Sequence, residues 1–493
     1  MRPKAGRLLR ILAVLAVAVF FRTYRLDTLP GFNFDEAHAA ANAARFAAGE
    51  RLDPLRLYPH GVAQEVLGGF QPGFYYLWPS AFLELFGWSL GVWRATSIVL
   101  SVGIVLLLYP LGARALGERR AFVAALLLAG SRWHVSDGRW GWVVIFADFV
   151  TAAGALLVFA GLKRPSPVPL AAGGALLALS TPLYGAALPP LVASAALVLL
   201  GSRSRRATLA FAAGASIGLI PFAVMALRQP AELLARARSA SVVADAAGSS
   251  VLLFMAGNAI LYAGLFLFRG DPLPFHTLPG TPALDVLSGL AFFAGLLLAL
   301  RRPRRSRAAF TLFLLGAALA AGVLAQGADA PNQYRVSLAA VFVALLAADG
   351  LLVAARLLSK KVRFPWRAGV AAVVFGSLLL NARFLFATWP KERSLYEAYG
   401  GPYTRMANDV RRVLDRGRSV WVDPNLLNDP VLLRTALARD LHEASRPFSE
   451  WPAPAVRVTG RPLPEDALFL PASSAEGTPR TDPWGNVLYR IRE

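Results

Sequence analysis

Long apolar runs separated by short basic clusters set the pattern of this chain. Runs such as 94–111, 142–162 and 207–227 approach the roughly 20 residues that a membrane-spanning helix needs. Arginine and lysine gather between the runs, for example in 203–206 and 301–307. Together with several shorter runs, this pattern predicts a polytopic α-helical membrane protein with about eleven transmembrane helices.

The basic clusters also predict an orientation. A basic start precedes the apolar run 11–21, and no small-residue cleavage site follows it, so we expect an uncleaved first helix with a cytoplasmic N-terminus. The segment 24–91 is then the first outer loop. Only one crossing fits between a later outer loop, which begins near Arg228, and the basic cluster 301–307. We assign that crossing to 284–300 and expect 251–268 to be an interfacial or re-entrant helix outside.

The tail 389–493 has mixed charge and lacks long apolar runs. Its patterns include the alternating stretch 419–422 and a helical run over 403–414. We therefore expect a transmembrane domain over 1–388, followed by a small soluble extracytoplasmic α+β domain over 389–493.

Composition agrees with a membrane protein. Hydrophobic residues make up 56% of the 493 residues, charged residues only 16%, and the mean hydropathy is +0.49, which excludes an ordinary soluble domain. The net charge of +21 lies in the loops between runs, which favours lipid headgroups over nucleic acid as partners. No cysteine is present, which excludes disulfides and thiolate metal sites. High Ala, Leu, Gly and Arg usage fits a bacterial plasma (inner) membrane protein.

Ionisable residues other than arginine and lysine gather in the predicted outer loops. Asp35 and Glu36 open an Ala-rich segment that ends at Gly49, which predicts a short helix with Asn33 or Asp35 as its N-cap. A catalytic site would therefore face outward. The outer loops bring together, among other ionisable residues, Asp35, Glu36, His38, Glu65, Arg132, His134, Asp137, Arg139, Asp271, His276 and Arg335.

Four passages of the chain resemble the GT-C superfamily of membrane glycosyltransferases, which contains protein O-mannosyltransferases and aminoarabinose transferases. They are Asp35-Glu36-Ala37 with Ala44-Arg45, Gln71-Pro72-Gly73-Phe74-Tyr75-Tyr76, Ser131-Arg132-Trp133-His134 with Asp137 and Arg139, and Gly270-Asp271 with His276 to Asp285. Some relatives have Lys-Pro-Pro where this chain has Gln71-Pro72-Gly73, so this segment brings no positive charge. The resemblance covers the membrane part and says little about the tail.

The resemblance implies transfer of a sugar, with inversion, from a polyprenyl-phosphate carrier to a protein, lipid or cell-envelope glycan acceptor at the outer face. It implies Asp35 as the base, with Glu36 either supporting it or pairing with a nearby cation. The expected contacts to the donor phosphate are Arg132, Arg139, Arg335 and Gln71. Further site candidates are His38, His134, Asp137, Asp271 and His276.

Other interpretations stay open at this stage. Acidic residues are also favoured at a helix start by about 0.3–1 kcal/mol, and Arg139 and Arg335 also fit as headgroup anchors. His134 and His276 fit interfacial packing equally well. A divalent cation on His134, Asp137 and Asp35 is an alternative without tight ligand spacing, and no other cofactor is implied. The alternative functions are a lipid-linked glycan flippase, which would use ionisable groups inside the spans, and a non-enzymatic assembly subunit.

Topology reporters test the predicted orientation. Fusions at Gly270 and at Arg304 are expected to report opposite sides of the membrane, because a single crossing separates the two positions. A pair of alkaline phosphatase and fluorescent-protein fusions measures this, and the same side for both positions would contradict the assignment of 251–268.

Overall fold

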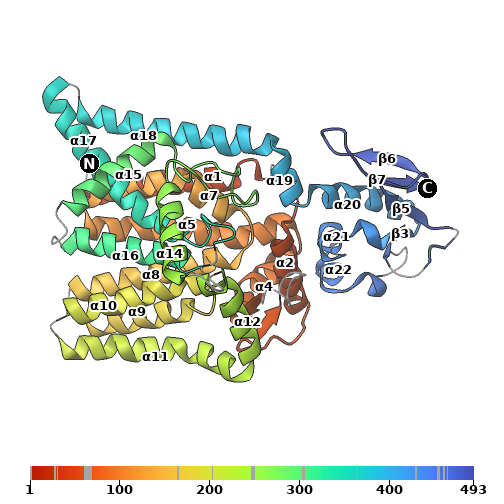
Figure 1. Ribbon diagram of the computed structural model, residues 1–493, viewed down its shortest axis with the longest axis horizontal. Helices are drawn as coiled ribbons and strands as arrows, with labels where there is room; N and C mark the ends of the chain where they lie inside the picture. Colours follow the sequence, from red (N-terminus) through yellow and green to blue (C-terminus); the bar gives the residue numbers. More distant parts are fainter. Residues whose placement is uncertain are drawn as a thin grey trace.

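Apolar helices that run side by side form most of the molecule, and a small sheet domain lies at one end of them (Figure 1). The computed structural model describes the chain except for residues 1–2, 27–28, 30, 60–68, 164–165, 203, 246–249, 302–305, 326, 363–364, 428–429, 452–455, 459–460, 464 and 493. Glu65 and the middle of the basic cluster 301–307 therefore lie outside the described residues.

Each predicted apolar segment of the bundle is a helix. These helices are α1 (Pro3–Thr23), α5 (Leu90–Ala115), α6 (Glu118–Gly130), α8 (Val143–Lys163), α9 (Pro167–Ser180), α10 (Leu188–Gly201), α11 (Arg205–Arg228), α15 (Val286–Leu300), α16 (Ser306–Val323), α17 (Ala339–Val362) and α18 (Trp366–Arg383). Among the described residues, five helices are long and apolar enough to cross a membrane, and five further apolar helices are shorter. The chain is an integral membrane protein, and the number of crossings stays a prediction.

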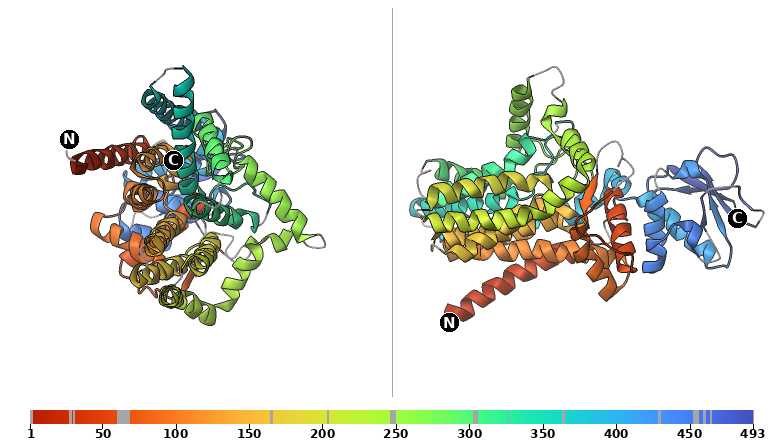
Figure 2. Two further views of the ribbon diagram at one scale, coloured as in Figure 1. Left: turned by 90° about the vertical axis from the view of Figure 1, so that its left-hand side faces the viewer. Right: turned by 90° about the horizontal axis from the view of Figure 1, so that it is seen from below.

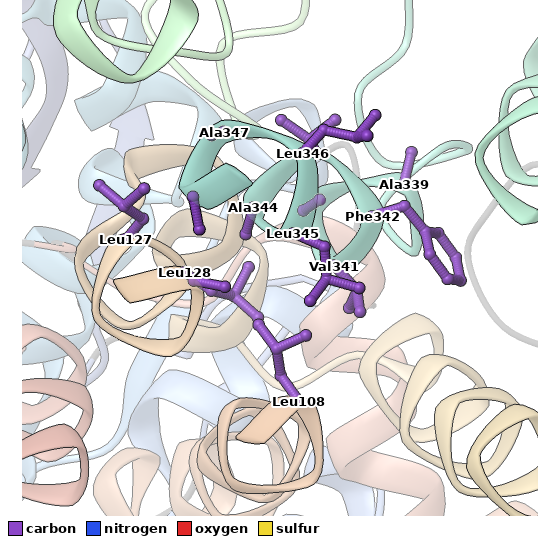
Figure 3. Packing of buried hydrophobic residues seen from close by; sticks show 14 of the residues in the cluster. Leu108, Leu127, Leu128, Ala339, Val341, Phe342, Ala344, Leu345, Leu346 and Ala347 are labelled. Carbon is purple, nitrogen blue, oxygen red and sulfur yellow. The ribbon is translucent and has the colours of Figure 1, made fainter. Parts of the chain in front are cut away.

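Helix α17 is the centre of the bundle. Its residues from Ala339 to Ala348 are all buried, and leucines of α5 and α6 pack against them, including Leu108 and Leu128 (Figure 3). Glycines let α15 approach α17 closely: a Cβ on Gly295 would lie 1.9 Å from the carbonyl oxygen of Leu346. Because lipid tails are as apolar as leucine, such close backbone packing is a principal source of attraction between membrane helices.

A set of short elements covers the end of the bundle that faces the sheet domain. They are α2 (Phe34–Ala47), β1 (Leu57–Pro59), β2 (Phe70–Pro72), α4 (Gly73–Phe86), α7 (Arg132–Arg139) and a 3₁₀ turn over Gly185–Ala187. Strands β1 and β2 pair antiparallel, with Tyr58 opposite Gln71. This end of the molecule therefore contains the first outer loop predicted from the sequence.

The segment from α12 to α14 leaves the bundle sideways. Helices α12 (Pro230–Ala240), α13 (Val242–Asp245) and α14 (Val251–Gly264) run steeply across the direction of the long helices (Figure 2, right). Helix α14 exposes large apolar side chains, among them Leu252, Leu253 and Ile260. The interfacial or re-entrant placement of 251–268 stays a prediction.

The C-terminal domain begins where α18 continues into a π-helical turn over Phe384–Thr388 and a 3₁₀ turn over Trp389–Lys391. Its helices are α19 (Arg393–Ala398), α20 (Gly401–Leu414), α21 (Pro430–Leu437) and α22 (Leu441–Ser445), with 3₁₀ turns at Pro424–Leu426 and Phe448–Glu450. The strands are β3 (Val420–Val422), β4 (Val456–Arg457), β5 (Ala467–Pro471), β6 (Thr478–Thr481) and β7 (Val487–Arg492). Their order is β4-β3-β5-β7-β6, parallel as far as β5 and antiparallel beyond it. The predicted α+β character of the tail is therefore correct.

The close approach of α15 and α17 gives a stability test. We expect Gly295→Ala to lower the free energy of unfolding by about 1–3 kcal/mol, because its Cβ would overlap the backbone of α17. Gly316→Ala in α16 is the matched control, since nothing lies within 4 Å of the added Cβ there. Thermal unfolding in detergent measures both variants, and equal midpoints would contradict the packing argument.

Candidate active site

Helix α2 begins with a complete capping box. The Asn33 side chain accepts a hydrogen bond from the backbone N–H of Asp35 (3.1 Å), and Glu36 Oε2 accepts one from the backbone N–H of Asn33 (3.2 Å). These bonds satisfy donors that a helix start otherwise leaves unpaired. The helix start predicted near Asn33 is correct, and both carboxylates lie in the first turn.

Glu36 forms a buried ion pair with Arg94 at the start of α5. Arg94 donates from Nε and Nη2 to the two carboxylate oxygens, both at 3.0 Å, and the backbone N–H of Gly141 donates to Oε1 at 2.9 Å. The Glu36 and Arg94 side chains are 0% and 1% exposed. Of the two roles expected for Glu36, the structure shows the pairing with a cation.

Asp35 lies on a different face of α2. Apart from Phe34 and Ala47 near its two ends, the partly exposed positions of α2 are Asp35, His38, Asn42 and Arg45, and the remaining positions are buried. The spacing of three, four and three residues places these four side chains along one face of a helix. We call this set the α2 face; it begins with Asp35 in the first turn.

A cleft of about 870 Å³ lies between α2 and the C-terminal domain. From the α2 side it is lined by His38, Asn42, Arg45 and Glu50, and from α21, α22 and the following turn by Arg434, His442, Arg446 and Glu450. Arg45 forms a two-pronged pair with Glu50, with bonds of 2.7 and 2.6 Å. The cleft is thus polar and contains three guanidinium groups, and Asp35 lies one helical turn from its wall.

Gln71 is connected to the α2 face through a tyrosine. Its Oε1 accepts a hydrogen bond from the Tyr76 hydroxyl (2.9 Å), and the same hydroxyl accepts one from Asn42 Nδ2 (3.1 Å). Burial raises the pKa of Tyr76, so the phenol keeps the proton that it donates. Gln71 Nε2 is buried and has no hydrogen-bond partner among the described residues. The Nε2 group of Gln71 is therefore left with both of its N–H donors, close to the predicted site.

The predicted phosphate-binding arginines bind carbonyl groups or a carboxylate in this structure. Arg139 donates to the carbonyl oxygens of Phe21, Tyr24 and Arg25, at 3.1, 3.0 and 2.7 Å, and so caps the C-terminal end of α1. Arg132 donates to the carbonyl oxygen of Leu284, and its guanidinium lies over the ring of Phe384. Arg335 pairs with Asp329 at 2.9 Å.

His134 also serves the packing of α1. Its Nδ1 lies 2.6 Å from Arg22 Nη2, and its ring is buried. Burial, with the nearby Arg22 charge, lowers the pKa of His134 well below the usual range, so the ring is neutral and Nδ1 accepts from the guanidinium. Of the two open interpretations of His134, this contact favours the structural one.

Asp137, Asp271 and His276 gather in a buried polar cluster. His276 Nδ1 lies 2.8 Å from Asp271 Oδ2, and its ring stacks on Tyr334 with ring centroids 4.8 Å apart. Neither carboxylate oxygen of Asp137 accepts a hydrogen bond of normal geometry from a described residue. Burial, followed by the charges of Asp148 and Asp271, raises the pKa of Asp137 well above its usual range. The protonated, neutral form of the Asp137 carboxyl group is therefore favoured relative to an exposed aspartate.

The structure thus separates the predicted residues into groups. Asp35, His38 and Gln71 lie at or near the α2 face, whereas Asp137, Asp271 and His276 form the inner cluster. Among the described residues, no three Asp, Glu or His side chains lie close enough to hold a metal ion, so the set His134, Asp137 and Asp35 is not assembled. Sequence reasoning missed Arg94 and the side chains that the C-terminal domain brings to the cleft.

The Glu36–Arg94 pair yields a stability prediction. We expect Arg94→Met to lower the free energy of unfolding by about 3–5 kcal/mol, because it leaves the Glu36 carboxylate buried without its cation. Arg120→Met is the matched control: its pair with Asp349 is partly exposed, and such pairs contribute about 0–1 kcal/mol. Chemical or thermal unfolding in detergent distinguishes them, and similar losses in both variants would rule out a special role for the buried pair.

Comparisons with known proteins complete the description of the site. No protein-family model and no curated protein matches the chain. Among solved structures, the chain is similar to ArnT from Cupriavidus metallidurans bound to undecaprenyl phosphate, with a TM-score of 0.57 and 15% identity over 99% of this chain and 98% of that chain.

A second similar structure is the Archaeoglobus fulgidus oligosaccharyltransferase tethered with an acceptor peptide containing the NVT sequon. Its TM-score is 0.52 and its identity 13%, over 88% of this chain and 63% of that chain. At such identities the similarity shows the fold alone. Both proteins are GT-C superfamily glycosyltransferases, and this chain has the GT-C fold that the four sequence passages predicted.

Proposed function

We propose that this protein is an inverting glycosyltransferase that moves a sugar from a polyprenyl-phosphate donor to an acceptor at the outer face of the membrane. The observation that carries the proposal is the α2 face, which begins at Asp35 and continues into a polar cleft of about 870 Å³. The similar ArnT structure contains undecaprenyl phosphate, a lipid of the proposed donor class.

Asp35 has the properties that the proposed base requires. Its side chain is partly exposed, it lies in the first turn of a helix whose start is capped, and the N-terminal end of a helix favours a negative charge by about 0.3–1 kcal/mol. Glu36 is sealed from solvent by its ion pair and is out of reach of an acceptor. We therefore assign the proton transfer to Asp35 and the support of the helix start to Glu36.

The proposed reaction needs one proton acceptor. The acceptor hydroxyl oxygen forms a bond to the anomeric carbon of the sugar while the bond from that carbon to the phosphate oxygen breaks. Its electron pair leaves with the polyprenyl phosphate, and the hydroxyl proton goes to the Asp35 carboxylate. Attack opposite to the leaving group inverts the anomeric centre, and the phosphate leaves without being protonated.

Positive charge near the leaving phosphate is the second requirement. The guanidinium groups of Arg132 and Arg139 bind backbone carbonyl oxygens and so have a structural role. Arg45, Arg434 and Arg446 line the cleft itself. We therefore propose that the cleft arginines, together with the unpaired Nε2 group of Gln71, are better placed than Arg132 and Arg139 to bind an anion. That anion is the phosphate of the sugar donor or an anionic group of the acceptor.

The distribution of charge supports the proposed orientation. Arg10 pairs with Glu118, and Lys163 donates to the carbonyl oxygen of Arg114, so the start of α1 and the ends of α5 and α8 lie together. In Figure 1 the N-terminus lies at the end of the bundle opposite to the C-terminal domain. With the positive-inside rule, this supports the proposal of a cytoplasmic N-terminus and an outer C-terminal domain. The bacterial plasma membrane is the proposed location.

No specific observation favours the flippase alternative. Two carboxylates within α8 and α17 each have a polar partner: Asp148 accepts a hydrogen bond from Ser337 (2.5 Å), and Asp349 pairs with Arg120.

Replacement of Asp35 tests the proposed chemistry. We expect Asp35→Asn to lower transfer by about 10²–10⁴-fold, the usual contribution of a positioned base, while the protein stays folded and binds undecaprenyl phosphate. Asp53→Asn is the matched control, since Asp53 lies in the same outer segment in an exposed pair with Arg228. Membranes supplied with radiolabelled polyprenyl-phosphate sugars provide the assay. Substantial turnover by the Asp35 variant would remove this residue as the base.

A further inference from the structure

The C-terminal domain touches the start of α2 at a point of very close backbone approach. A Cβ on Gly31 would lie 2.0 Å from Thr404 Oγ1 and 2.8 Å from the carbonyl oxygen of Tyr399. Gly400 faces it with a φ of +59°, and a Cβ there would lie 2.7 Å from the carbonyl oxygen of Phe32. Two glycines thus allow the backbones of the two domains to meet directly before α2.

Asn33 joins this contact to the proposed base. Its Oδ1 accepts from the backbone N–H of Asp35 (3.1 Å), and its Nδ2 donates to the carbonyl oxygen of Ala398 (2.9 Å) in the C-terminal domain. The residue is 5% exposed. A carboxamide combines an acceptor and a donor in one side chain, and so it makes both bonds at once.

The C-terminal side of the bridge is itself fixed to the membrane domain. The Tyr399 hydroxyl donates to the carbonyl oxygen of Phe275 (2.8 Å), and the Arg94 guanidinium lies over the Tyr399 ring, 5.8 Å from its centroid. Tyr399 is buried. Ala398 is therefore held in place relative to the membrane domain by the contacts of the adjacent Tyr399.

Two cavities lie between the membrane domain and the C-terminal domain. One is the cleft of about 870 Å³ beside the α2 face; the other, of about 280 Å³, is lined by Gly31, Phe32 and Trp88 from the membrane domain and by Thr404 and Arg411 from the C-terminal domain. Because parts of the interface are open, the tight contact around Gly31 and Asn33 is well placed to set where the C-terminal domain holds the start of α2.

We propose that Asn33 is a positioning residue, through which the C-terminal domain holds the Asp35 carboxylate in the place that proton abstraction requires. This inference rests on the proposed function. The physical reason is that misplacement of a catalytic group by about 1 Å costs on the order of 10²-fold in rate. The C-terminal domain is then part of the catalytic machinery and not only a wall of the cleft.

The test separates the two bonds of Asn33. Serine is also a good N-cap, so Asn33→Ser keeps an acceptor for the first turn of α2 but removes the donor to Ala398. Gly31→Ala leaves Asn33 intact and forces the two backbones apart. The control is Asn425→Ser in the C-terminal domain, because the exposed Asn425 donates to the nearby Asp423 within its own turn, away from α2 in the sequence.

Steady-state kinetics on purified full-length protein provide the readout, with the same radiolabelled donors and with active protein counted by the stoichiometry of undecaprenyl phosphate binding. We expect kcat to fall about 10–100-fold in Asn33→Ser and Gly31→Ala, with the donor KM within about twofold, and no change in Asn425→Ser. We also expect faster hydrogen exchange at the amides of residues 34–38 in both bridge variants.

The outcomes distinguish a failure of the positioning role of Asn33 from a failure of the proposed function. Wild-type kcat in both bridge variants, with Asp35→Asn inactive, would overturn the positioning role and leave the proposed function standing. Full activity of Asp35→Asn would overturn the proposed function itself. A fall in bound undecaprenyl phosphate that accounts for the whole loss of activity would show a merely structural role, and it would also overturn the positioning role.

Discussion

The buried ion pair between Glu36 and Arg94 is the interaction on which the end of the bundle next to the C-terminal domain depends. Taking two charges out of water is expensive, and the pair is tolerable only because nearly every polar atom in it has a partner. Arg94 also donates to the carbonyl oxygens of Gly31 and Leu29, so one side chain holds the chain before α2 and the first turn of the helix together.

Three buried arginines share a common logic at the end of the bundle near the C-terminal domain. Arg22, Arg94 and Arg139 are 0–2% exposed and bind carbonyl oxygens of neighbouring elements, with a carboxylate added for Arg94. A planar guanidinium offers five donors in fixed directions, which suits the joining of several backbone segments at one place. Of these three, Arg139 is the one that the sequence analysis links with phosphate binding. In the structure its guanidinium instead binds carbonyl oxygens at and after the end of α1.

The apolar pattern predicted most of the fold because each membrane helix is marked by its own continuous run of apolar residues. The segments 142–162 and 207–227 correspond closely to α8 and α11. The sequence predicts an outer loop over 131–139; within it, Arg132–Arg139 form the short helix α7, whose polar side chains are largely buried. The N-cap and the position of Asp35 and Glu36 were predictable for the same reason as the helices, because capping depends on neighbours in sequence.

The partners of those residues were not predictable, because they come from distant parts of the chain. Arg94 lies 58 residues from Glu36, and Ala398 lies 365 residues from Asn33. One signal for Arg94 was present. The positive-inside rule disfavours an arginine at the predicted outer end of a span, so an arginine at that place points to a specific partner within the protein. Nothing comparable marks Arg434 or Arg446, whose relevance depends on how the C-terminal domain docks.

The bridge from Asn33 to Ala398 also has a consequence for biosynthesis. Helix α2 leaves the ribosome among the first segments, but the carbonyl group that its N-cap binds is made only near the end of the transmembrane region. The start of α2 therefore cannot reach its final arrangement until almost the whole bundle has been inserted and the last domain has begun to form on the same side. A truncated or stalled chain would carry every motif of the first outer loop without the completed site.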